Sequence, residues 1–127
     1  MNSNFKIALA ALVGAALSAA AMQGLHAQAK PKAYTVAELE TLDAAAQAAY
    51  LPVVRAAQTA AGGRNLRTGG GKIVASEGAA PKSVAIIEWD SLEQAEAFFK
   101  SKAFTDLASQ REKALKTIRR YAVEVMN

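Results

Sequence analysis

Arg111 is a charged residue that falls on the predicted apolar face of a helix. It lies four residues after Leu107 and four before Leu115, a spacing that places the three side chains on one side. A desolvated guanidinium without a partner is costly, so we expect an internal ion pair with Glu88 or Glu77, or an aliphatic stem that carries the charge to water. The alternative is that this guanidinium holds a carboxylate or phosphate ligand.

Glu88 is the second candidate, because it ends an apolar stretch and precedes Trp89. A carboxyl group partly removed from water can have a raised pKa and act as a base. The simpler expectation is a position at the rim of a sheet, paired with Arg111 or hydrated. Glu77 precedes a glycine in a predicted loop and should be more exposed. Trp89 and Tyr34 could line a ligand pocket, although aromatic residues at such spacings more often belong to a core.

Absent residue types exclude several classes of site. The chain has 127 residues and no cysteine, and its one histidine, His26, lies in a segment that we predict to be removed. This excludes a disulfide framework, a cysteine nucleophile, a histidine-based triad, an ordinary zinc site and a haem held by histidine. There is no Asp-x-Asp pair, and glycines 69–71 lack the Lys-Ser/Thr ending of a phosphate-binding loop. We therefore predict neither a metal nor a cofactor.

The balance of charge is mildly basic, with 15 Lys and Arg against 11 Asp and Glu. Apart from the pair Arg119-Arg120, the basic residues are scattered, whereas a nucleic-acid site would need a basic stripe with interleaved aromatic residues. We predict that the protein does not bind nucleic acid.

Residues 1–29 have the layout of a signal peptide. A short start with one positive charge, Lys6, precedes the uncharged residues 7–22, and Ala27-Gln28-Ala29 has the small-x-small form of a cleavage site. A membrane anchor formed by residues 7–22 is the alternative, but 16 helical residues span only about 24 Å of a hydrocarbon core of about 30 Å. We expect cleavage near residue 29, a periplasmic or secreted protein and no stable membrane insertion afterwards.

Hydrophobic periodicity and turn residues predict the elements that position the candidate side chains. In chain order, the expected elements are strand 33–39, a helix from Asp43 to Ala61 kinked at Pro52, strand segments 64–67 and 72–76 around the glycines, strand 83–89, helix 91–100 with the capping box Ser91 and Gln94, a second helical stretch to about residue 117, and strand 120–126. The order β-α-β-β-α-β predicts an α+β, ferredoxin-like single domain over residues 30–127, with a four-stranded antiparallel sheet.

Strand 83–89 is apolar on both of its faces, with Val84 and Ile86 on one and Ala85, Ile87 and Trp89 on the other. The helices predicted for this chain suffice for one side of the sheet, and none is left for the other. We therefore expect a homodimer in which the sheet of a second copy covers the other side. The alternative is a cover formed by a long loop of the same chain.

Several segments together resemble the domain of unknown function 1330 family. They are Gly-Gly-Arg-Asn-Leu-Arg at 62–67, glycines 69–70, Glu77-Gly78, the strand 84–89, the helix 91–95, Phe-Phe-Lys-Ser at 98–101, Phe104 and Arg111. The resemblance covers nearly all of residues 32–126, and it rests on order and spacing. The chain departs from the pattern at Thr68, which separates Arg67 from the glycines, at Ala79-Ala80 and at Val36.

The resemblance implies a ferredoxin-like fold of the dimeric α/β-barrel type and no established reaction. We expect an exported homodimer that binds a small organic or anionic ligand. The alternatives are a cofactor-independent oxygenase or isomerase that acts on a small aromatic or lactone-type substrate, and a structural protein with a filled barrel. No catalytic residue is assigned; the ligand-binding candidates are Arg111, Glu88, Trp89, Arg67, Glu77 and Tyr34.

Overall fold

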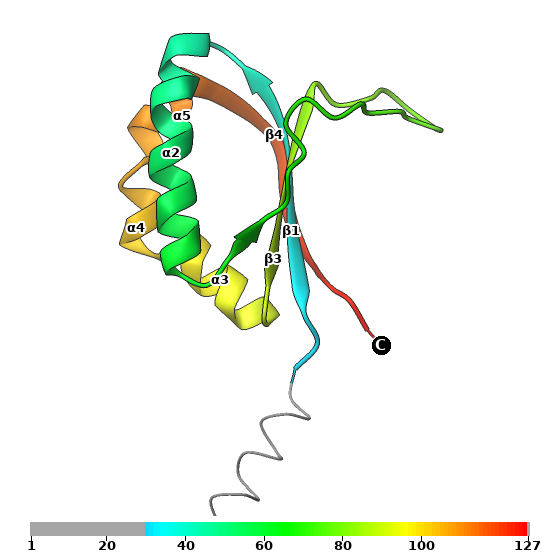
Figure 1. The fold of residues 1–127 in the computed structure, drawn as a ribbon, viewed down its shortest axis with the longest axis vertical. Coiled ribbons are helices and arrows are strands. Elements are labelled where there is room, and N and C mark those ends of the chain that lie inside the picture. Colours follow the sequence, from blue (N-terminus) through cyan, green and yellow to red (C-terminus); the bar gives the residue numbers. More distant parts are fainter. Residues whose placement is uncertain (1–29, 127) are drawn as a thin grey trace, which may run out of the picture. The chain divides into compact units, whose positions relative to one another are not determined.

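The computed structural model describes residues 30–126, which form a four-stranded antiparallel sheet with the helices of this segment on one face (Figure 1). The strands are β1 (Ala33–Thr41), β2 (Arg64–Asn65), β3 (Ser83–Trp89) and β4 (Leu115–Glu124), in the order β2-β3-β1-β4. The helices are α2 (Ala44–Ala60), α3 (Leu92–Lys100), α4 (Lys102–Thr105) and α5 (Ala108–Ala114). The predicted signal peptide lies outside the described residues.

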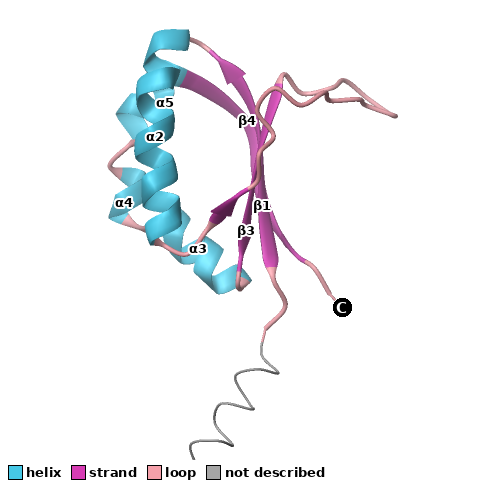
Figure 2. Cartoon of the chain, viewed as in Figure 1, coloured by secondary structure: helices cyan, strands magenta, loops and turns pink. Residues whose placement is uncertain are grey.

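The expected α+β class is confirmed, and Figure 2 shows its two layers, with α2 to α5 packed on one side of the sheet. The opposite side, here called the open face, carries no helix of the described chain. The long loop 66–82 leaves the sheet on that side without covering it, since Tyr121 and Val123 stay about half exposed, at 49% and 48%. The alternative prediction, that a long loop of the same chain covers this side of the sheet, is therefore wrong.

Side-chain caps fix the starts of α2 and α3 as predicted. The Asp43 side chain accepts a hydrogen bond from the backbone N–H of Ala46 at 2.8 Å, and the Ser91 hydroxyl accepts one from that of Gln94 at 3.2 Å. Helix α2 runs through Pro52 to Ala60, and Gly62 follows its C-cap residue Ala61 with a φ of +93° that suits glycine. At Gly63 a Cβ atom would lie 2.9 Å from the side chains of Ile87 and Trp89, so only glycine lets the chain pass this close to β3.

Two predicted elements are wrong. Residues 72–76 form no strand, because the exposed loop 66–82 does not return to the edge of the sheet, and the pairing of β2 is limited to Arg64 and Asn65. The second helical stretch ends at Ala114 instead of residue 117, and β4 begins at Leu115. Leu115 pairs with Thr41 at the far end of β1, so cross-strand hydrogen bonds outweigh the local helical pattern there.

The core lies between the sheet and the helices. Trp89 is fully buried there, its ring centroid 5.4 Å from that of Phe98, and its indole N–H donates to the Thr35 hydroxyl at 3.1 Å. The other buried apolar side chains of this core are Tyr50, Val54, Ile87, Ala95, Phe104, Ala114 and Leu115. Trp89 is thus a core residue, which is the simpler of its two sequence interpretations.

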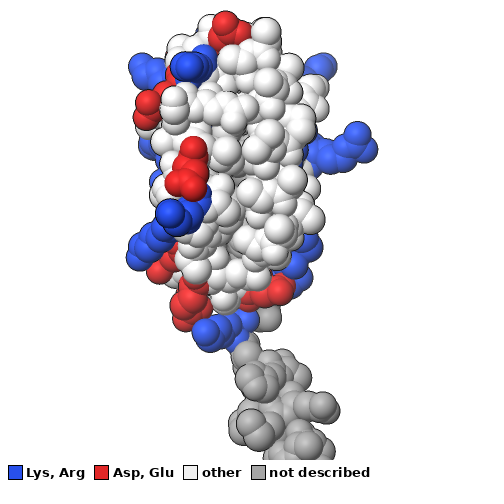
Figure 3. Space-filling view, turned by 90° about the vertical axis from the view of Figure 1, so that its left-hand side faces the viewer, with Lys and Arg blue, Asp and Glu red and all other residues white. Residues whose placement is uncertain are grey.

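The outward face of α2 carries little charge, because the whole helix has one charged residue, Arg55. Val53, an apolar residue of α2, is 45% exposed. Figure 3, which views the helical side, shows a continuous surface without Lys, Arg, Asp or Glu along the molecule, with charges at its margins. Within residues 30–126, no helix is both long and apolar enough to cross a membrane.

Candidate functional site

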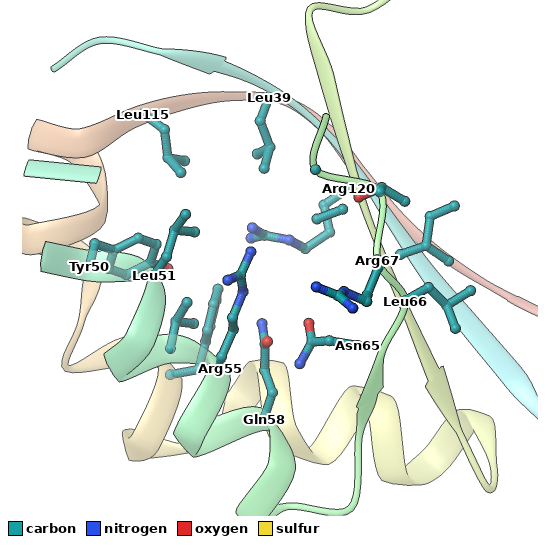
Figure 4. Close-up of a pocket in the computed structure, with 16 residues that line it drawn as sticks. Leu39, Tyr50, Leu51, Arg55, Gln58, Asn65, Leu66, Arg67, Leu115 and Arg120 are labelled. Carbon is teal, nitrogen blue, oxygen red and sulfur yellow. The ribbon is translucent and has the colours of Figure 1, made fainter. Parts of the chain in front are cut away.

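A cavity of about 410 Å³ lies between the sheet, α2 and the segment that follows β2 (Figure 4). Apolar side chains form much of its wall: Leu39, Leu51, Val54, Phe104 and Leu115. The polar groups that line it are the side chains of Tyr50, Arg55, Gln58, Asn65, Arg67 and Arg120, together with Thr68. An apolar wall with a few polar groups is the usual composition of a small-molecule site.

Arg120 reaches this cavity from β4 because side chains alternate along a strand. It pairs with Ala37 of β1, a buried residue on the helix-facing side, so its side chain points toward the helices. Its guanidinium carbon lies 5.1 Å and 5.0 Å from the ring centroids of Phe99 and Phe104. Burial lowers the pKa of Arg120, and repulsion from Arg111 lowers it further.

Gln58 reaches the same cavity from α2. The residue is 8% exposed, and its side-chain Oε1 atom is buried without a hydrogen-bond partner. A buried acceptor left unpaired costs free energy, about 1–3 kcal/mol. Gln58 therefore leaves one acceptor available to a molecule that donates a hydrogen bond inside the cavity.

The charges around the cavity are unbalanced. Arg55, Arg67 and Arg120 point into the same space (Figure 4), and no Asp or Glu of the described residues lines it. No carboxylate of residues 30–126 forms a salt bridge with any of these three arginines. The site is therefore electropositive, and its chemistry favours an anion.

Arg111 does not form the expected pair with Glu88. Its guanidinium carbon lies 4.0 Å from the ring centroid of Phe104, and its Nη1 donates to the Phe104 carbonyl at 3.4 Å and to the Tyr50 hydroxyl at 3.5 Å. Arg111 belongs to α5, on the helical side of the sheet, whereas the Glu88 side chain lies on the open face. The predicted ion pair between Arg111 and Glu88 is therefore wrong.

Glu88 is instead the centre of a hydrogen-bonded cluster on the open face. Its carboxylate accepts from the Tyr34 hydroxyl at 2.7 Å, from Nε of Arg64 at 2.8 Å and from Nζ of Lys32 at 3.2 Å. Arg64 also pairs with Asp90 at 2.9 Å. The register of the sheet explains the cluster, since Tyr34 and Arg64 both lie directly across from Glu88.

These donors lower the pKa of Glu88 from 4.5 to about 2, the largest cause being the hydrogen bond from Tyr34. The same hydrogen bond raises the pKa of Tyr34. A carboxylate stabilised in this way is a weak base near neutral pH. The interpretation of Glu88 as a base with a raised pKa is therefore wrong. The expected pairing with Arg111 is wrong as well, since the partners of Glu88 are Tyr34, Arg64 and Lys32.

Acid is expected to weaken the fold through this cluster. The folded-state pKa lies below the ordinary value, so the stabilisation is present above pH 4.5 and is lost as the pH falls through about 2. The Tm measured between pH 6 and pH 2 should fall, and Glu88→Gln should flatten that fall without abolishing it, because Arg119 also lowers the pKa of Glu38. Glu96→Gln, an exposed change on α3, is the control; equal pH profiles for the two variants would contradict the assignment.

The structure distributes the other candidates among different places. Arg67 lines the cavity, whereas Glu77 lies in the exposed loop 66–82. Sequence reasoning missed Arg120, Arg55 and Gln58. For Arg120 a signal existed, because Tyr121 and Val123 alternate with it and share the other face. Among residues 30–126, no group of three or more potential metal-ligating His, Cys, Asp or Glu residues comes together.

Comparisons with solved structures agree with this fold. A protein of unknown function from Rhodopseudomonas palustris, RPA0582, is 15% identical, with a TM-score of 0.59 over 82% of this chain and 93% of that one. SnoaB, a cofactor-independent oxygenase from Streptomyces nogalater, is 11% identical, with a TM-score of 0.56 over 76% of this chain and 95% of that one. No curated protein matches the sequence. The sequence profile of the family described as "Domain of unknown function (DUF1330)" matches residues 32–126, and the chain belongs to that family.

Proposed function

We propose that the protein binds a small organic molecule in the cavity between its sheet and α2. The observation that carries this proposal is the cavity itself, about 410 Å³ of space with apolar walls and a few polar groups. A purely structural protein of this fold would be expected to fill that space with side chains. The cavity therefore favours binding over the filled-barrel alternative.

Catalysis without a cofactor is the second candidate, and the likeness to SnoaB, itself a cofactor-independent oxygenase, favours it. In the cavity, Arg120 could stabilise a developing anion, as positioned cations do in enzyme sites. Oxygen uptake, or isomerisation of a bound aromatic or lactone-type compound, would establish this activity.

A thermal-shift screen of the purified protein against small aromatic and aliphatic compounds tests the binding proposal. A compound present at ten times its Kd should raise the Tm by about 5 °C or more. Ala85 lines the cavity, so Ala85→Leu should remove the shift, while Ala97→Leu on the exposed side of α3 should keep it. A screen in which no compound raises the Tm, or a shift that survives Ala85→Leu, would overturn the proposal.

The working unit in this proposal is a homodimer that pairs the open faces of two sheets. Val36, Val84, Ile86, Tyr121 and Val123 share that face by the register of the strands. Ion pairs lie around them: Arg119 with Glu38 at one end, and Lys32 and Arg64 with Glu88 at the other. An apolar centre with a charged rim is the usual anatomy of a protein interface.

The proposal also includes export of the protein from the cytoplasm. The charged start, the uncharged residues 7–22 and the Ala27-Gln28-Ala29 site support cleavage near residue 29 and a periplasmic or secreted protein. The mass of the protein recovered outside the cytoplasm tests this, and a chain that still begins at Met1 would contradict it.

A further inference from the structure

Arg120 differs from the other two arginines of the cavity in how firmly it is held. Arg55 and Arg67 are exposed, whereas Arg120 is half-buried beside the rings of Phe99 and Phe104. A guanidinium held between aromatic rings loses little rotamer freedom when it binds a partner. Arg120 is therefore preorganised as an anchor, and Arg55 and Arg67 add positive charge around it.

The position of Arg120 also brings two like charges together. Arg111 and Arg120 both lie over the ring of Phe104, at 4.0 Å and 5.0 Å from its centroid, and no carboxylate of residues 30–126 pairs with either. Arg120 repels Arg111 and is partly desolvated, so the empty state is electrostatically unfavourable. An anion in the cavity would relieve both costs.

The rest of the lining narrows the class of anion. Leu39, Leu51 and Val54 present hydrocarbon to the cavity, which suits an organic body better than an inorganic ion. The planar fork of a guanidinium matches a carboxylate with two parallel hydrogen bonds. The buried Oε1 of Gln58 needs a donor, and a hydroxyl group on the ligand supplies one.

From these observations we infer that the ligand is a small, largely apolar hydroxy acid, with its carboxylate on Arg120 and its hydroxyl donating to Gln58. The inference rests on the proposed function and adds the chemical class of the ligand. Each of the two polar contacts should contribute separately, because the two groups come from different elements, β4 and α2.

Isothermal titration with matched probes tests this assignment. The probes are 3- and 4-hydroxybenzoate, benzoate without the hydroxyl, 4-hydroxybenzamide without the charge, and inorganic phosphate without the organic body. The better hydroxybenzoate should bind about 10-fold more tightly than benzoate. Its hydroxyl forms one additional hydrogen bond, and that bond pairs the buried Oε1 of Gln58 that benzoate leaves unpaired. The same hydroxybenzoate should bind about 10- to 100-fold more tightly than the amide, because hydrogen bonds to charged groups are stronger.

Two variants separate the two contacts. Arg120→Met should lower the affinity for hydroxybenzoate about 10- to 100-fold, to that of the amide, and should fold because it removes a desolvated charge. Gln58→Leu should abolish the preference for hydroxybenzoate over benzoate while both still bind. Lys113→Met removes one charge from the exposed side of α5 and is the control, in which affinity should not change. Melting curves followed by circular dichroism verify that each variant is folded.

The outcomes distinguish this inference from the proposal on which it rests. Loss of acid binding in Arg120→Met, together with loss of the hydroxyl preference in Gln58→Leu, supports the hydroxy acid. Neutral aromatic compounds that bind as tightly as the acids, or phosphate that binds as tightly as hydroxybenzoate, would overturn the ligand class and leave a small-molecule site in place. If no probe and no screened compound binds, both the ligand class and the proposed function are overturned.

Discussion

Trp89→Ala is expected to lower the free energy of unfolding by about 3–5 kcal/mol, the usual cost of truncating a buried tryptophan or phenylalanine to alanine. Trp89 is 0% exposed and contacts the rings of Phe98 and Phe99, and the chain passes it closely at Gly63. Neighbouring rings cannot fill the vacated volume without moving away from their own contacts. Since the free energy of unfolding of a small domain is only about 5–15 kcal/mol, this substitution should remove a large part of it.

Urea unfolding measures this cost, at one fixed protein concentration because association changes apparent stability. The companion variant is Thr35→Val, which preserves the volume but leaves the Trp89 indole N–H without its acceptor. It should cost about 1–3 kcal/mol. A cost below about 1 kcal/mol for Trp89→Ala would show that this cluster is not the centre of the core.

Tyr121→Arg combined with Val123→Arg is expected to convert the proposed dimer into a monomer. Both side chains are about half exposed on the open face. Arginines at these two positions would bring like charges together across a two-fold interface. Light scattering at micromolar concentration should then report about half the mass of the unmodified protein. The unmodified protein should scatter as a dimer.

Val53→Arg is the matched control for this experiment. Val53 is 45% exposed, nearly the same as Val123 at 48%, but it lies on the outward face of α2. It should leave the mass of the dimer unchanged. An unmodified protein that is monomeric at micromolar concentration would overturn the dimer, and a monomer produced by Val53→Arg would place the interface on the helices instead.

The elements of this fold could be predicted because their signals are local. Asp43 and Ser91 cap helices within three residues of themselves, and strand 83–89 is bounded by a turn and a cap. Local patterns failed near Leu115, where the apolar spacing suits a helix and a strand equally well. Pairing with β1, more than seventy residues away, decided that segment.

The candidate site was predicted less well, because it depends on which face of the sheet packs against the helices. Arg111 packs against Phe104 and Tyr50 on the helical side, but its expected partner Glu88 lies on the other side of the sheet. Arg120 has the decisive position, yet in sequence it is one half of a basic pair beside a strand. Arg119 and Arg120 point to opposite faces, and one reaches Glu38 while the other reaches the cavity.

The sequence by itself determined the order of elements, the family and the two faces of strand 83–89, since these follow from spacing along a single segment. The tertiary structure decided the contacts between segments. Tyr34 and Glu88 are 54 residues apart and meet through the β1–β3 register. Arg120 and Gln58 meet at one cavity because β4 and α2 pack on the same side of the sheet. Periodicity predicts which side chains share a face of one segment. Which residues of other segments contact that face depends on packing and on strand register.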